Sequence, residues 1–174
     1  MEIKELIKNI EAWGIERELD KKGTVEGQSI KTAEEISELI IGISKNKIDV
    51  VKDSIGDVFV TLVIGNMLDM MLDIYEEYYK EVARNLETYL EENKKEEIAC
   101  LAQGITDVIR NGYDDDTLYY GLTNLMAIAD VYDLDFVDCV ESAYNEIANR
   151  KGKMVNGTFV KEEDFENWRI SRKT

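Results

Sequence analysis

Residues 33–65 read AEEISELIIGISKNKIDVVKDSIGDVFVTLVIG, and their apolar spacing predicts two packed helices. Glu35 and Glu38 lie three residues apart in the first helix, and Asp53 and Asp57 lie four apart in the second. Residues at these spacings share one face of a helix. If the two helices pack antiparallel, the four carboxylates converge. Such a cluster repels itself without a cation, and its all-oxygen ligands suit Mg²⁺, with Mn²⁺ as the alternative.

An acidic pair on a helix is weak evidence when taken alone, because 37 of the 174 residues are Asp or Glu. Most such pairs lie on a solvated face. The segment after Asp57 strengthens the case, because VFVTLVIG is almost wholly apolar and places Asp53 and Asp57 at the mouth of a buried helix. A carboxylate in that position is costly without a cation or a hydrogen-bond partner. The pattern therefore favours a metal site.

The composition restricts both the fold and the chemistry. A chain of 174 residues fits one domain over 1–174, and the lack of proline permits long helices. The net charge of −16 argues against nucleic-acid binding. The lack of histidine excludes imidazole catalysis and His-type zinc sites, and two cysteines are too few for a Cys₄ zinc site. The cysteines fit a reduced, cytoplasmic protein, and the charged N-terminal segment is neither a signal peptide nor a membrane span.

Apolar periodicity predicts an all-α helical bundle. The expected helices cover residues 3–13, 29–45 with Ser29 as the N-cap, a third from Asp49, and then 69–98, 96–110, 115–131 and 135–149. A loop is expected over residues 23–27. The segment MVNGTFV carries Asn-Gly between short apolar runs, which predicts a C-terminal β-hairpin. In the tail after it, Phe165 and Trp168 are expected to anchor the chain to the bundle.

An internal repeat appears when the chain is shifted by 62 residues against itself. EEISELIIGI at 34–43 then aligns with EEIACLAQGI at 96–105, with six identities in ten positions. Two amphipathic helices can resemble each other by composition, but this clustering favours duplication. We expect two tandem helical hairpins in one bundle, a metal-binding repeat at 34–90 and a degenerate repeat at 96–152. The hairpin and tail follow at 153–174.

The second copy has lost half of the candidate ligands, because Glu38 aligns with Cys100 and Asp57 aligns with Tyr119. One half is then competent, and the other is expected to form a wall for the ligand. Its aromatic residues would be available for stacking: Tyr113, Tyr119 and Tyr120. The protein is expected to be either a homodimer or a pseudo-dimeric monomer.

The chain resembles the MazG-like, all-α nucleoside triphosphate pyrophosphohydrolases of phage type, which are related to the dimeric dUTPases. That family carries ExxE, a spacer and then ExxD on two helices that bind Mg²⁺. Glu35 and Glu38 match the first pair, and Asp57 matches the final aspartate. Further similarity lies in Trp13, Arg17, the spacing of Gln28, Lys31 and Glu34, and the segment AYNEIANRKGKMVNGTFVKEED at 143–164.

One departure from the family pattern concerns the first residue of ExxD, which falls on Ser54. Asp53 lies one residue earlier and shares a helix face with Asp57, so we expect Asp53 to supply the missing carboxylate. In the alternative, Ser54 holds a water at the site.

The resemblance implies that a metal-activated water attacks a nucleoside triphosphate and releases the monophosphate and pyrophosphate. Glu35, Glu38, Asp53 and Asp57 would hold the metal. Glu34 or Glu38 would accept the proton as the catalytic base. The residues expected to bind the substrate are Trp13, Gln28, Lys31, Asn145, Arg150, Lys151 and Lys153.

Several alternatives stay open. Trp13 suits core packing as well as base stacking, and the basic run at 149–153 suits compensation of a helix dipole. The function itself has two alternatives. One is a dUTPase-type enzyme of narrow specificity, and the other is a non-catalytic helical interaction protein with a decayed site.

Overall fold

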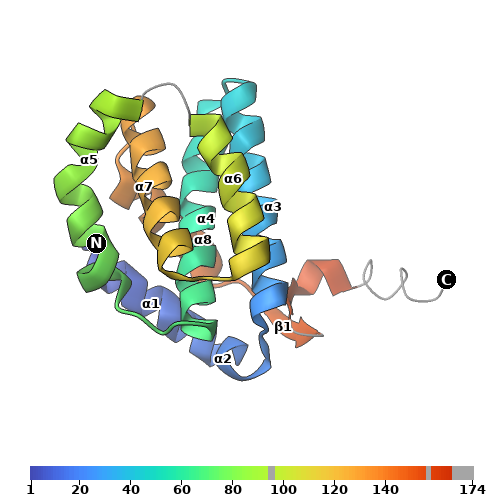
Figure 1. Ribbon diagram of the computed structural model, residues 1–174. Coiled ribbons are helices and arrows are strands. Elements are labelled where there is room, and N and C mark those ends of the chain that lie inside the picture. The colour runs from blue at the N-terminus through green and yellow to red at the C-terminus, as the bar shows by residue number, and fades with distance from the viewer. Residues whose placement is uncertain (94–96, 156–157, 166–174) are drawn as a thin grey trace.

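Helices build almost all of the computed structural model, which describes residues 1–93, 97–155 and 158–165 (Figure 1). The α-helices are α1 (Ile3–Glu16), α2 (Leu19–Lys22), α3 (Val25–Ser44), α4 (Ile48–Leu68), α5 (Lys80–Asn93), α6 (Glu97–Asn111), α7 (Asp115–Val131) and α8 (Phe136–Ala148). A two-stranded sheet follows, with β1 (Gly152–Val155) and β2 (Thr158–Lys161). The predicted all-α bundle with a short C-terminal hairpin is confirmed. No helix in these described segments is long and apolar enough to cross a membrane.

Helix α4 lies at the centre of the bundle. Every residue from Val58 to Asn66 is buried, because the run after Asp57 is apolar on all sides. A helix of that kind needs neighbours around it. Helices α1, α3, α7 and α8 pack against α4 and provide them. Asp57 therefore lies directly before the part of α4 in which every residue is buried.

Helix α3 begins four residues before the predicted start. Thr24 is the N-cap, and its Oγ1 accepts a hydrogen bond from the Gly27 backbone N–H at 3.1 Å. The loop expected over 23–27 is therefore mostly helical, and Ser29, expected to be the N-cap, is buried within the helix. A threonine cap stabilises the first turn enough to accommodate Gly27 inside it.

The segment 69–98 also differs from its prediction as one helix. The Asp73 carboxylate accepts hydrogen bonds from the backbone N–H groups of Tyr75 and Glu76, each at 3.1 Å, and starts a π-helical turn over Tyr75–Tyr79. Helix α5 continues from that turn. Helices α6, α7 and α8 lie close to their predicted ranges, and aspartate caps begin α7 and α8.

Two helical hairpins lie side by side in the bundle. Helix α3 pairs with α4 and α6 pairs with α7, while α6 packs on α3 and α7 packs on α4. The shift of 62 residues superposes α3 on α6 and α4 on α7 in sequence. This pairing is what a tandem repeat requires, and the duplication itself stays a prediction.

The C-terminal strands pair antiparallel, with Gly152 opposite Lys161 and Val155 opposite Thr158. The Asn-Gly turn that predicted this hairpin lies outside the described residues, as does Trp168. Phe165 packs below the Lys153 ammonium group, which lies 4.4 Å from the ring centroid. Phe159 of β2 packs against Trp13 of α1, and the strand shares a cavity with residues of α4 and of the end of α8.

Candidate functional site

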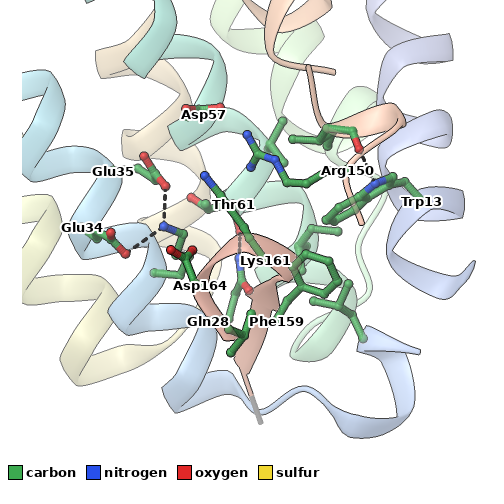
Figure 2. A pocket seen from close by; sticks show the side chains of 16 residues that line it. Trp13, Gln28, Glu34, Glu35, Asp57, Thr61, Arg150, Phe159, Lys161 and Asp164 are labelled. Atoms are coloured by element: carbon green, nitrogen blue, oxygen red, sulfur yellow. Dashed lines mark hydrogen bonds and ion pairs between the residues drawn. The ribbon is translucent and has the colours of Figure 1, made fainter. Parts of the chain in front are cut away.

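A cavity of about 320 Å³ lies between the C-terminal hairpin and helices α1, α3, α4 and α8 (Figure 2). Its volume falls at the lower end of the range for small-molecule sites. Part of the lining is apolar and aromatic: Trp13, Leu19, Val60, Ile64, Ile147 and Phe159. Another part is charged: Lys31, Glu34, Glu35, Asp57, Arg150, Lys161 and Asp164. In Figure 2 Glu34 and Glu35 lie on one side of the cavity, and Trp13 lies on the other.

Asp57 is the most perturbed carboxylate of this cavity. Its side chain is half-buried and accepts no hydrogen bond from the described residues. Burial is the main cause that raises the pKa of Asp57 to about 7, and the negative charges of Glu35, Asp53 and Glu146 add to it. Three helices, α3, α4 and α8, thus bring negative charge to one place. The charges of Glu35 and Asp53 thus act on Asp57, and the joint role of Glu35, Glu38, Asp53 and Asp57 as metal ligands stays a prediction.

Glu38 and Asp53 are exposed and do not line the cavity. Partial burial, followed by the charges of Glu35 and Glu34, raises the pKa of Glu38. Partial burial, followed by the charges of Glu146 and Glu35, raises the pKa of Asp53. Both exposed carboxylates therefore interact with Glu35 through space.

Asp53 and Ser54, the two candidates for the missing family glutamate, have different surroundings. Ser54 is 3% exposed and belongs to the core side of α4. Asp53 is exposed and faces the charges of Glu35 and Asp57. The electrostatic contacts of the carboxylate cluster thus reach Asp53.

Lys31 pairs with the two glutamates of the cavity wall. Its Nζ lies 2.8 Å from Glu34 Oε2 and 2.8 Å from Glu35 Oε1 (Figure 2). Burial lowers the pKa of Lys31, but hydrogen bonds to Glu34 and Glu35 outweigh it and raise the pKa above its usual value. Lys31 therefore neutralises part of the negative charge of the cavity. One of its two partners is Glu35, which the sequence assigns to the metal.

Whether a divalent cation fits this site depends on the spacing, type and charge of the carboxylate groups. Within the described segments, no group of three or more Asp, Glu, Cys or His side chains stands at metal-ligand spacing. The donors are carboxylate oxygens, the ligand type that Mg²⁺ and Mn²⁺ prefer. Burial is the main cause of the raised pKa values of Glu38, Asp53 and Asp57, and the charge of Glu35 adds to each. The donor chemistry therefore suits a divalent cation, whereas the described side chains, as they lie, are not gathered around one point.

Trp13 and Gln28, which the sequence assigns to substrate binding, line the cavity, and both also hydrogen-bond to other helices. The Trp13 indole Nε1 donates to the Ile147 carbonyl oxygen at 2.8 Å, near the end of α8. The Gln28 amide Nε2 donates to the Thr61 carbonyl oxygen at 3.1 Å, in the middle of α4. Each side chain is therefore fixed at a wall of the cavity.

The basic residues near the end of α8 lie at different places. Arg150 lines the first cavity and also a second cavity of about 520 Å³, which Lys151 lines as well. Lys161, which the sequence did not single out, lines both cavities. Arg150 also forms an ion pair with Glu146. Lys153 and Asn145 are exposed and line neither cavity.

The sequence did not single out Phe159, Lys161 and Asp164, which also line the first cavity. Phe159 and Lys161 are two residues apart on β2 and therefore lie on one face of the strand. The alternation Phe-Val-Lys after the predicted turn was the available signal. Its meaning depends on where the hairpin docks, which the local sequence does not specify.

The second helical hairpin does not form the expected wall of the ligand cavity. None of the described lining residues of the first cavity lies between 97 and 131. Tyr113 is fully buried, and its hydroxyl lies 2.7 Å from Thr32 Oγ1, so it is not available for stacking. Its ring lies against Gly65 of α4, where a side chain would collide with it. Helices α1 and α8 and the C-terminal strands supply the wall instead.

Comparison with known proteins gives a partial match. The chain is similar to an "uncharacterized 18.2 kDa protein in rep-hol intergenic region" of Haemophilus phage HP1 (strain HP1c1). The two are 48% identical over 75 residues, which cover 41% of this chain and 46% of that protein. The match thus spans less than half of the relative's length. No protein-family model matches the chain, and no solved structure does so.

Proposed function

We propose that this protein hydrolyses a nucleoside or deoxynucleoside triphosphate to the monophosphate and pyrophosphate, with Mg²⁺ or Mn²⁺ as cofactor. The observation that carries the proposal is Asp57, a half-buried carboxylate with a pKa of about 7, among carboxylates from three helices. Arg150 and Lys161 line the same cavity. Carboxylates suit a metal ion, and the adjacent cations suit the phosphates that such a metal binds.

The carboxylates of α3 and α4 are assigned to the cofactor. Glu35, Glu38, Asp53 and Asp57 would hold it. When bound, Mg²⁺ supplies neutralisation of phosphate charge and a lower pKa for an attacking water. Of these four, Glu35 already pairs with Lys31, whereas Glu38, Asp53 and Asp57 form no ion pair with a described residue.

The structure favours Glu38 over Glu34 as the general base. Glu34 is paired with Lys31, whereas Glu38 forms no ion pair with any described residue. The pKa of Glu38 is raised, which brings it closer to the range in which a carboxylate accepts a proton efficiently. Its exposed side chain is accessible to water.

The cations of the two cavities are assigned to the phosphates. Lys31 and Arg150 face the first cavity, and Arg150 and Lys151 face the second. Gln28 and Trp13 line the same space as the phosphate-binding residues and would contact the nucleoside. This division gives a nucleotide one charged end and one largely apolar end to occupy. The reaction would clear unwanted nucleotides from the cytoplasmic pool.

A turnover screen tests the proposal. Common nucleoside and deoxynucleoside triphosphates, and dUTP, are incubated with the protein and Mg²⁺, and pyrophosphate is detected. We expect pyrophosphate from at least one nucleotide, and turnover of dUTP alone would indicate a dUTPase-type enzyme. Glu26→Gln is the matched control for the Glu38→Gln variant, because Glu26 is an exposed glutamate of α3 that lines neither cavity. The proposal fails if no nucleotide yields pyrophosphate with Mg²⁺ or with Mn²⁺.

One observation favours a second candidate function, a helical interaction protein without turnover. Lys31 already pairs with Glu34 and Glu35, and the described side chains include no group at metal-ligand spacing. In that case neither Mg²⁺ nor Mn²⁺ would bind with measurable heat in a calorimetric titration. Metal binding together with turnover excludes this candidate.

A further inference from the structure

Trp13 is the aromatic residue that the sequence assigns to the base, but its N–H group and one face of its ring already have partners within the protein. Its Nε1 donates to Ile147, and the Arg17 guanidinium lies 4.6 Å from the centre of its rings. Arg17 in turn donates to the Arg150 carbonyl oxygen at 3.0 Å, at the end of α8. Trp13 therefore joins α1 to α8 and is held in place from two directions.

Phe159 presents a second ring to the same cavity. Its centroid lies 5.6 Å from that of Trp13, with an angle of 64° between the two planes. Gly152 on the opposite strand makes room for this ring, because a Cβ at that position would lie 2.4 Å from Phe159 Cζ. The Phe159 side chain is half-buried and lines the cavity. The hairpin thus places an aromatic surface beside the apolar lining.

The same strand carries a cation toward the carboxylates. Lys161 is two residues from Phe159, and Figure 2 shows its amine directed to the centre of the cavity, beside Arg150. Among the described residues, Lys161 forms no ion pair within 4.0 Å of a carboxylate oxygen. A half-buried ammonium group without such a partner is suited to an anionic ligand.

We propose that β2 contacts both ends of the substrate: the base stacks on Phe159, and the phosphates bind beside Lys161. The inference rests on the proposed function, since it takes the substrate to be a nucleotide. Stacking uses the π-face that every base possesses, so Phe159 contributes to the affinity of purine and pyrimidine nucleotides alike. Lys161 contributes to any ligand that carries the phosphate chain.

Calorimetric titration with two kinds of probe separates these roles. The first kind is an α,β-imido deoxynucleoside triphosphate with a purine or a pyrimidine base, and the second is inorganic tripolyphosphate, all with Mg²⁺. For Phe159→Ala we expect nucleotide affinity to fall roughly 10- to 100-fold, while tripolyphosphate binding stays unchanged. Phe159→Tyr keeps the ring and should restore nucleotide affinity. Lys161→Met should weaken both probes by a similar factor.

The outcomes distinguish the inference from the proposed function. If Phe159→Ala binds the imido nucleotides like the unsubstituted protein, or loses tripolyphosphate equally, the stacking role is overturned. If Lys161→Met binds tripolyphosphate normally, the phosphate role is overturned. A protein that binds the imido nucleotides as described but releases no pyrophosphate from true substrates retains this inference and loses the proposed reaction. A protein that binds no nucleotide loses both.

Discussion

The two helical hairpins carry different residues at positions that the shift of 62 residues aligns. In α3–α4, Asp57 is half-buried without a hydrogen bond from the described residues, and its pKa is about 7. In α6–α7 the equivalent position is Tyr119, and Asp115, equivalent to Asp53, accepts a hydrogen bond from the Tyr78 hydroxyl at 2.6 Å. Of the two carboxylates that the second hairpin keeps at these positions, Glu97 and Asp115, Asp115 therefore has a hydrogen-bond partner, whereas Asp57 of the first hairpin has none among the described residues. Uncompensated charge that persists beside a cavity is typical of a functional site.

The glycines of the two hairpins show a similar contrast in packing. A Cβ on Gly42 would lie 3.1 Å from the Val51 backbone nitrogen, so α3 and α4 approach closely there. At the equivalent Gly104 a Cβ would meet nothing within 4 Å. A small cavity of about 30 Å³ adjoins Gly104, and the buried Thr117 hydroxyl that lines it lacks a described partner. The first hairpin is thus tightly packed at Gly42, and the second is open at Gly104.

Glu38→Gln should cause the largest loss of activity among the variants that test the difference between the two hairpins. The amide keeps the shape of the side chain but loses the charge that holds a cation and accepts a proton. We expect kcat to fall by about 10²- to 10⁴-fold without loss of the fold, measured as pyrophosphate release and circular dichroism. Glu97→Gln, at the position equivalent to Glu35 in the second hairpin, should leave turnover nearly unchanged. Equal losses in both variants would mean that both hairpins are catalytic.

Asp57 predicts how stability depends on pH when no metal is present. Its folded-state pKa of about 7 lies above the usual value of 3.8, so the folded state binds the proton more tightly than the unfolded state does. The free energy of unfolding should fall as pH rises from about 4 to above 7, by at most roughly 4 kcal/mol. Urea unfolding in EDTA at pH 5 and pH 8 measures the difference.

Asp57→Asn supplies the control for this pH dependence. The amide cannot ionise, so most of the difference between pH 5 and pH 8 should disappear. The variant should also be more stable than the unsubstituted protein at pH 8 in EDTA. A pH dependence that survives the substitution would assign the effect to other carboxylates.

Asp53→Asn and Ser54→Ala test which residue replaces the family glutamate. A hard divalent ion prefers anionic oxygen, so Asp53→Asn should weaken Mg²⁺ binding by about tenfold or more, while Ser54→Ala should change it little. Titration calorimetry measures both affinities. A harmless Asp53→Asn, combined with higher activity in Ser54→Glu, would show that Asp53 is no ligand.

Gly104→Ala and Gly42→Ala should give the smallest effects, and they should have opposite signs. Alanine at 104 gains helix propensity in open space and should stabilise the protein by about 0.5–1 kcal/mol. Alanine at 42 meets the Val51 backbone and should destabilise it. Melting temperatures decide the matter. A similar shift in both variants would remove the packing contrast between the two hairpins.

Periodic apolar patterns explain why most of the fold could be predicted. Helices α6, α7 and α8 follow regular apolar spacing, and α4 follows from the continuous run after Asp57. The start of α3 was missed because Gly23 and Gly27 suggested a loop, whereas the Thr24 hydroxyl caps the helix. Local spacing thus identifies helices well, and a single side-chain hydrogen bond moves a boundary.

The site was predictable only where its residues lie on neighbouring helices. The charges of Glu35 and Asp53 raise the pKa of Asp57, which places the three carboxylates near one another, while their role as metal ligands together with Glu38 stays a prediction. The pairing of Lys31 with Glu34 and Glu35 depends on side-chain positions that spacing does not specify. Lys161 comes from a hairpin about a hundred residues away in sequence, and only the docked position of that hairpin places it in the cavity.

The melting temperature with and without a divalent cation tests the central claim, that the α3–α4 carboxylates form a metal site. A cation that binds the folded state must raise the melting temperature by mass action. We predict a clear rise from EDTA to millimolar Mg²⁺ or Mn²⁺ at pH 8. The same rise should occur in Asp115→Asn, the matched aspartate of the second hairpin, and should be lost in Asp57→Asn. An unchanged transition at saturating metal, or an equal rise in all three proteins, would contradict the account.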